Sequence, residues 1–175
     1  MKRWINIKNI YVKLTDKYIY TYSDKIKKYD SKYIKNGTVD DVFKLIDYLN
    51  KILEKNIFKI KYTFILDTLL SNSDLFTFKY VFESMGLINY KIINDLDIIK
   101  NHVTDNNIII MNWSSSINYC FKLKDEIVVN KYNTNVINSL DKDYILMIGD
   151  TNISTKIKKP IYKYEHEELV IFNYL

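Results

Sequence analysis

Two aspartates occupy positions where side chains of an α/β protein can reach a ligand. Asp67 directly follows the apolar run Phe58–Leu66, and Asp150 lies just after the run Tyr144–Ile148. Ligands of open α/β sheets bind at the carboxyl ends of the strands, so these carboxylates could hold metal ions for a two-metal nuclease. Such an enzyme also needs an acid in its first strand, and Trp4–Lys8 contains none. We therefore interpret both aspartates as turn or capping residues, with a metal-dependent nuclease as the alternative.

The other residues with potential chemistry are isolated from one another. His102 and His166 have no second histidine or cysteine at ligand spacing, so we expect no metal site. Cys120 is the single cysteine, which excludes an intrachain disulfide and fits a reducing cytoplasm. The triplet Ser114-Ser115-Ser116 could bind an anion through its backbone, but a hairpin turn is the simpler interpretation. No catalytic residue is assigned.

The composition is that of a folded protein with a basic surface. Hydrophobic residues make up 47% of the 175 residues, and the net charge is +5. The lysines are scattered, so the charge permits binding to nucleic acid without indicating it, and a basic nucleic-acid-binding module remains an alternative. No apolar run is long enough to cross a membrane, and the amino terminus lacks the pattern of a signal peptide. We expect a cytoplasmic protein with at most peripheral membrane contact.

Three short β-type runs open the chain and predict a three-strand meander. They are Trp4–Ile7, Ile10–Leu14 and Tyr18–Tyr22, with turns at Lys8-Asn9 and Thr15-Asp16-Lys17. Hydrophobic periodicity then predicts two helices that alternate with two strands. These are a helix over residues 39–53 capped by Thr38, the strand Phe58–Leu66, a helix Leu75–Met85 capped by Ser73 and ended by Gly86, and the strand Tyr90–Ile93.

The second half repeats this order in a shorter form. A polar stretch at residues 94–106 suggests a boundary between two domains, 1–104 and 105–175. The predicted elements are three strands at Asn107–Trp113, Ile117–Leu123 and Glu126–Tyr132, one or two helical turns within Asn133–Lys142, strands at Tyr144–Ile148 and Pro160–Tyr164, and a helix at Glu165–Tyr174. Two meanders of the same shape suggest an internal repeat, and the pattern alone fits two unrelated hairpin-rich segments of an α/β protein equally well.

This order, occurring twice, resembles the actin-like ATPase superfamily, and the segments are most similar to bacterial MreB and FtsA. NIYVKLTDKYIYTYS resembles their second and third strands, NIIIMNWSSSINYCFKLKDEIVVNKY the opening of their second domain, and DYILMIGDTNI the strand and glycine turn that meets adenosine. The resemblance implies an α/β, duplicated ribonuclease-H-like (actin-like) fold. It would have two mixed sheets, each opening with a three-strand meander, and a reduced second half.

The family's nucleotide loops are altered in this sequence. The first phosphate loop of the family carries Asp and Gly between strands one and two, and the nearest residues here are Asn6, Lys8 and Asn9. In the second loop Met111 or Asn112 falls at the acid, and Trp113-Ser114-Ser115-Ser116 replaces the glycines. The adenosine turn keeps only Gly149, followed by Asp150.

These changes remove the groups that would hold a nucleotide. Glycines let backbone N–H groups close on phosphate oxygens, and acids orient Mg²⁺ and its waters. We therefore expect neither ATP nor Mg²⁺ as a cofactor, and no small-molecule substrate. The resemblance then implies a non-catalytic protein that assembles with a protein partner or with itself, as a cytoskeletal, division or envelope scaffold. A residual ATP-binding protein is the alternative within the same fold.

Overall fold

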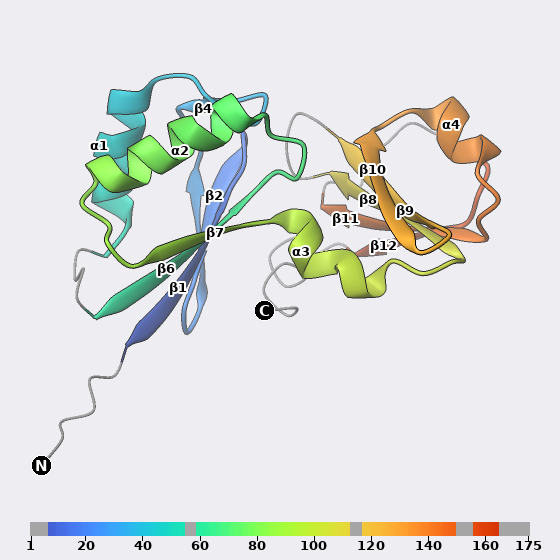
Figure 1. Ribbon diagram of the computed structural model, residues 1–175, viewed down its shortest axis with the longest axis horizontal. Coiled ribbons are helices and arrows are strands. Elements are labelled where there is room, and N and C mark those ends of the chain that lie inside the picture. Colours follow the sequence, from blue (N-terminus) through green and yellow to red (C-terminus); the bar gives the residue numbers. More distant parts are fainter. Residues whose placement is uncertain (1–6, 55–58, 113–116, 150–155, 165–175) are drawn as a thin grey trace, which may run out of the picture. The chain divides into compact units, whose positions relative to one another are not determined.

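The first half of the chain is built on a five-stranded mixed sheet (Figure 1). The computed structural model describes residues 7–54, 59–112, 117–149 and 156–164, and the contacts divide the chain into the units Met1–Asn94 and Asp95–Leu175. The elements of the first unit are β1 (Lys8–Leu14), β2 (Tyr18–Tyr22), β3 (Ile26–Asp30), β4 (Ile34–Lys35), β5 (Thr38–Val39), α1 (Val42–Ile52), β6 (Ile60–Leu66), α2 (Asn72–Ser84) and β7 (Tyr90–Asn94). The strand order is β3-β2-β1-β6-β7.

The second unit contains a sheet with the same plan. Its elements are α3 (Asp95–Ile99), a 3₁₀ turn (Lys100–His102), β8 (Asn107–Asn112), β9 (Asn118–Leu123), β10 (Glu126–Lys131), α4 (Thr134–Ser139), β11 (Tyr144–Gly149) and β12 (Ile161–Tyr164). The strand order is β10-β9-β8-β11-β12. The first three strands of each sheet pair antiparallel, and the last two run parallel to the central strand.

The matching strand orders confirm the predicted duplicated fold. In both sheets a meander comes first, and the fourth strand in sequence then pairs in parallel with the first strand of the meander. The second unit is reduced as predicted, because α4 has 6 residues where α1 has 11. The predicted Lys124-Asp125 hairpin is also present, with Leu123 paired to Glu126 and Lys124 at a φ of 56°.

The first meander is shifted by one strand from the prediction. Lys8 and Asn9 belong to β1 and do not form a turn, and the third strand is β3. Ile7 precedes the sheet, and Trp4–Asn6 lie outside the described residues. The sequence pattern did not predict β3 because this edge strand carries exposed Lys27, Lys28 and Asp30, which weaken the hydrophobic pattern of a strand. Charged side chains are common on edge strands, where they discourage pairing with other chains.

Both large helices begin earlier or later than predicted because a different side chain caps each one. Helix α1 starts at Val42, where the Asp41 carboxylate accepts the Lys44 N–H at 3.0 Å. Helix α2 starts at Asn72, where Ser71 Oγ accepts the Asp74 N–H at 3.1 Å. The predicted caps, Thr38 and Ser73, instead lie in β5 and within α2. Side-chain oxygens that accept the first free N–H groups fix where a helix begins.

The segment expected as a polar boundary, residues 94–106, forms α3 and the 3₁₀ turn. Ile98 and Ile99 are buried, and Asp95 and Asp97 lie in the first turn, where the helix dipole favours acids. Contacts assign this segment to the second unit, which therefore begins at Asp95 and not at residue 105. The helix expected at Glu165–Tyr174 lies outside the described residues, and the last strand starts at Ile161.

The core of the first unit lies between one face of its sheet and the helices α1 and α2, which both cover that face (Figure 1). Alternate residues of β1 and β6 point into this core, as the period of a strand requires. Aromatic rings fill its centre: Phe64 stacks on Phe82 with ring centroids 3.7 Å apart, and Tyr90 meets Phe82 edge-on at 5.6 Å. No helix among the described residues is long and apolar enough to cross a membrane.

Replacing Phe82 should destabilise the protein strongly. Phe82 is fully buried, so Phe82→Ala should lower the free energy of unfolding by about 3–5 kcal/mol through lost packing and a cavity. Phe76 lies on the same helix but is 69% exposed, and Phe76→Ala should change it by less than about 0.5 kcal/mol. Urea denaturation measures both. Similar effects of the two substitutions would contradict this core.

Candidate functional site

The loop between β1 and β2 is the place where the resemblance puts the first phosphate loop. It consists of Thr15, Asp16 and Lys17, so the assignment of Lys8 and Asn9 to this loop is wrong. Thr15 closes the turn with its own side chain. Its hydroxyl donates to the Tyr18 carbonyl at 2.7 Å and accepts the Tyr18 N–H at 3.0 Å, while the Thr15 N–H donates to the same carbonyl at 3.1 Å. Its hydroxyl and the Tyr18 N–H are thus already hydrogen-bonded within the protein.

The Asp16 carboxylate ties this turn to a neighbouring hairpin. Its Oδ1 accepts the Gly37 N–H at 2.7 Å. Asn36 and Gly37 both have positive φ, 53° and 77°, as in the tight turns that join two strands with an Asn-Gly pair. The hairpin β4–β5 was missed because its strands are only two residues long, although the Asn-Gly pair signals it. A phosphate loop offers its backbone N–H groups to a nucleotide. In this turn, by contrast, the Asp16 side chain accepts a backbone N–H from another loop of the protein.

Lys13 is the residue near this loop that sequence reasoning overlooked. It is the second-to-last residue of β1 and is only 1% exposed. Its cross-strand neighbours are Tyr20 on β2 and Ile65 on β6, on the sheet face opposite α1 and α2. Lys13 stands between the apolar residues Val12 and Leu14, so the two-residue period of a strand places it on the other face of the sheet.

Asp67 lies at the carboxyl end of β6, as predicted. Its Oδ1 accepts the Leu69 N–H at 2.8 Å, and its carbonyl accepts the Leu70 N–H at 3.4 Å. These bonds shape the turn that leads into α2. Strand β1, the first strand of the sheet, contains no Asp or Glu. In the described part of the chain no group of three His, Cys, Asp or Glu side chains could hold a metal ion.

In the second unit, Asn112 and Gly149 are neighbours at the carboxyl ends of β8 and β11. Asn112 is 5% exposed, and Gly149 has a φ of 96°, which side-chain-bearing residues rarely adopt. Gly149 thus retains the backbone freedom expected of a glycine turn. The other residues predicted for these loops, Trp113-Ser114-Ser115-Ser116 and Asp150, lie outside the described residues.

The isolated cysteine and histidine have structural surroundings. Cys120 is buried in β9, and burial followed by the nearby charge of Asp95 raises the pKa of its thiol to about 12. A thiol with such a pKa carries almost no thiolate and is a poor nucleophile. His102 is exposed, and its backbone carbonyl accepts the Asn107 side-chain amide at 2.9 Å. His166 lies outside the described residues.

Comparison with known proteins identifies the architecture. No protein-family model and no curated protein matches the chain. Among solved structures, it is similar to the ethanolamine utilization protein EutJ from Carboxydothermus hydrogenoformans, with 11% identity and a TM-score of 0.66 over 93% of this chain and 86% of EutJ. It is also similar to MreB5 of Spiroplasma citri in structures bound to ADP and AMPPNP.

The MreB5 comparisons give 12% and 11% identity with TM-scores of 0.55 and 0.54 over 75% of this chain. The chain has an actin-like fold. This confirms the predicted resemblance at the level of architecture. The actin-like chain spans about half the length of MreB5, since it covers 53% and 54% of the two structures.

Removing the Asp16 carboxylate should loosen the two loops that it joins. Asp16→Ala leaves the Gly37 N–H without its acceptor and should lower the free energy of unfolding by about 1–2 kcal/mol. Asp16→Asn retains an acceptor oxygen and should cost less. Amide hydrogen exchange measured by NMR should become faster at Gly37 in the alanine variant, and unchanged exchange there would contradict the contact.

Cys120 should make the stability of the protein sensitive to high pH. Its folded-state pKa is about 12, above the ordinary value of 9.0, so folding favours the protonated thiol. This contribution is fully present below pH 9 and is lost as the pH rises toward 12. The free energy of unfolding should therefore fall more steeply in this range for the natural chain than for Cys120→Ala, in which the tyrosines still titrate. If urea denaturation gave the same pH dependence of the unfolding free energy for the natural chain and for Cys120→Ala, the burial of the Cys120 thiol would be contradicted.

Proposed function

We propose that this chain is a non-catalytic actin-like protein of the cytoplasm that works through protein–protein assembly. Two features of the first unit support the loss of catalysis. The β1–β2 turn is closed by Thr15, and the Asp16 carboxylate is hydrogen-bonded to Gly37. A reducing compartment is supported by the single, buried Cys120.

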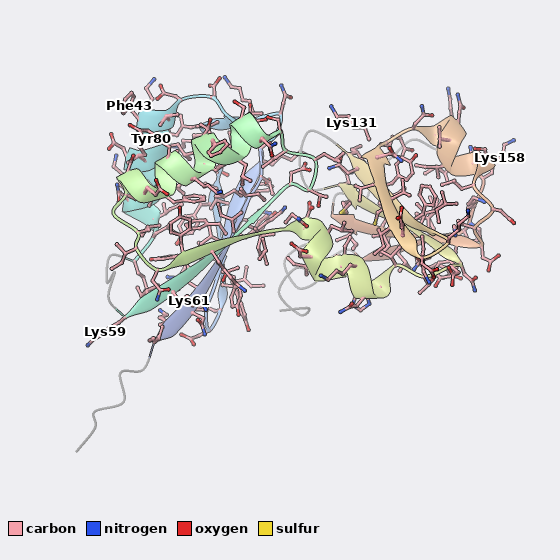
Figure 2. All side chains as sticks on the ribbon, viewed as in Figure 1. Phe43, Lys59, Lys61, Tyr80, Lys131 and Lys158 are labelled. Carbon is pink, nitrogen blue, oxygen red and sulfur yellow. The ribbon has the colours of Figure 1, made fainter. Side chains whose placement is uncertain are left out.

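The observation that carries the assembly proposal is a set of exposed aromatic side chains on the helices of the first unit. Phe43 on α1 is 74% exposed, and Phe76 and Tyr80 on α2 are 69% and 54% exposed. The two helices pack against each other, and Figure 2 places Phe43 and Tyr80 on this helix layer. We call these three residues the aromatic helix surface. Large exposed aromatic side chains on neighbouring elements are typical of sites that bind other proteins.

The spacing along each helix explains why these aromatics point outward. In α2, Phe78, Val81 and Phe82 face the sheet and are buried, while Phe76 and Tyr80, four residues apart, share the opposite face. In α1 the buried residues are Leu45 and Leu49, and Phe43 lies off that stripe. The core of the unit is already filled by other aromatic rings, so these side chains are not needed to complete it. Burial against a second protein would remove them from water.

A residual nucleotide-binding protein is the second candidate. Gly149 keeps the positive φ that a glycine turn at the end of β11 requires, and the similar MreB5 structures are bound to ADP and AMPPNP. Calorimetric titration of the chain with ATP and Mg²⁺ separates the two candidates. Assembly without catalysis predicts no binding heat up to millimolar ATP, whereas micromolar binding would favour this second candidate.

Assembly through the aromatic helix surface is tested by removing its rings. The natural chain should self-associate with increasing concentration in sedimentation velocity, and Phe43→Ser/Phe76→Ser/Tyr80→Ser should remain a monomer. As a control, Leu123→Ser and Tyr162→Ser alter residues of the second unit that are 57% and 58% exposed, and should leave association unchanged. A monomeric natural chain, or equal losses in both variants, would contradict self-association through this surface.

A further inference from the structure

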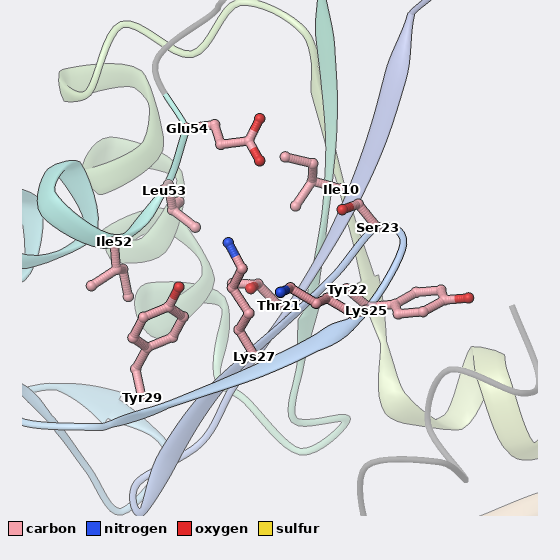
Figure 3. A pocket seen from close by; sticks show the side chains of 10 residues that line it. All are labelled: Ile10, Thr21, Tyr22, Ser23, Lys25, Lys27, Tyr29, Ile52, Leu53 and Glu54. Atoms are coloured by element: carbon pink, nitrogen blue, oxygen red, sulfur yellow. The ribbon is translucent and has the colours of Figure 1, made fainter.

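A solvent-open hollow lies in the first unit, at the end of the sheet away from the β1–β2 turn (Figure 3). Its floor is formed by β1 and β2, its outer wall by the edge strand β3, and its inner wall by the residues that end α1. The hollow combines apolar side chains with lysines and hydroxyl groups. It belongs wholly to the first unit and does not overlap the loops where the resemblance puts the nucleotide.

The hollow exists because α1 ends before the sheet does. The last helical residue is Ile52, and Leu53 has an extended backbone with φ −92° and ψ 147°. The strand register places Thr21 next to Val12 and Lys27 next to Thr21, so this row of side chains runs across the helix-covered face toward the edge. The residues that end α1, Ile52 and Leu53, line the hollow beside this row. A polar pair, Thr21 and Lys27, therefore occupies positions that are apolar elsewhere on this face.

Two ammonium groups point into the hollow. Figure 3 shows the amino groups of Lys25 and Lys27 directed into the space beside Thr21, and the Tyr29 hydroxyl directed toward the same space. Neither lysine has an ion-pair partner within the described ranges of the chain. Two positive charges directed at one space repel each other. An anion between them would attract both ammonium groups and offset this repulsion.

Among the residues that line the hollow, Glu54 carries a carboxylate that is already engaged. Glu54 Oε1 accepts a hydrogen bond from Lys8 Nζ at 2.6 Å, and the hydrogen bond to Glu54 raises the pKa of Lys8. The ion pair offsets the negative charge of Glu54 that would otherwise repel an anion in the hollow. The hollow therefore presents a positive charge to a ligand, carried by Lys25 and Lys27.

The arrangement fits an anion with several acceptor oxygens and a small apolar part. Ammonium groups are good phosphate ligands, and the hydroxyls of Thr21, Ser23 and Tyr29 can donate further hydrogen bonds. Ile10 and Leu53 supply an apolar side for a carbon group attached to the phosphate. We propose that this hollow binds a small phosphate monoester, held by Lys25 and Lys27.

Calorimetric titration of the whole chain with phenyl phosphate and with inorganic phosphate tests this proposal. Phenyl phosphate should bind more tightly than inorganic phosphate, because its ring adds contact with the apolar side. Phenol, which lacks the charge, and benzoate, which has a planar anion with fewer oxygens, should bind more weakly than phenyl phosphate. Absence of binding by both phosphate probes, or equal binding of benzoate and phenyl phosphate, would overturn the proposal.

A matched pair of double variants locates the site. Lys25→Met/Lys27→Met keeps the apolar stems but removes both ammonium groups, and should weaken phenyl phosphate binding by at least about tenfold. Lys59→Met/Lys61→Met makes the same change in net charge at two exposed lysines, one just before β6 and one within it, labelled in Figure 2, and should leave binding unchanged. Equal weakening in both double variants would show only general charge attraction and overturn the proposal.

The assembly variants provide an independent check. The hollow does not include Phe43, Phe76 or Tyr80, so phosphate binding should persist in the variant that lacks the aromatic helix surface. Loss of phosphate binding in the lysine variant should likewise leave self-association intact. The two proposals can therefore fail separately.

Discussion

The parallel pairing of β1 with β6 is the constraint on which the first unit depends. Two parallel strands cannot be joined by a tight turn, so the chain must cross over the sheet between them. Helix α1 makes this crossing and, with α2, buries one face of the sheet. The pairing of β8 with β11 imposes the same requirement on the second unit, where α4 makes a shorter crossing. The two units thus share one plan because each solves the same connection problem.

The alternation of apolar and polar residues, together with residues typical of turns, predicts most of the strand and helix order from the sequence. The apolar runs of β2, β6, β8 and β11 are strong enough to predict from the sequence, and Gly86 correctly marked the end of α2. The edge strand β3 and the hairpin β4–β5 were missed, since charge or short length weakens the hydrophobic signal that identifies a strand. Missing β3 moved the first meander by one strand and misplaced its first loop. Order along the chain is therefore easier to predict than register.

The candidate loops were harder to predict because their chemistry depends on contacts between distant residues. Asp16 and Gly37 are 21 positions apart, and only the folded chain shows that one accepts the other's N–H. The hollow depends likewise on where α1 ends relative to an edge strand that sequence patterns did not reveal. Residue types in a sequence suggest what chemistry is possible, whereas the lengths of elements decide which residues share a space.

The β1–β2 turn has a consequence for how this chain can evolve. Only Asp16 and Lys17 separate Thr15 from Tyr18, and the side chains of Thr15 and Asp16 hold the turn closed. No single substitution adds backbone N–H groups to so short a loop, and each one that frees Thr15 or Asp16 also weakens the fold. A longer loop with more free N–H groups would require an insertion together with compensating changes in the neighbouring hairpin. Selection can therefore alter the surface of this fold far more readily than it can open this turn.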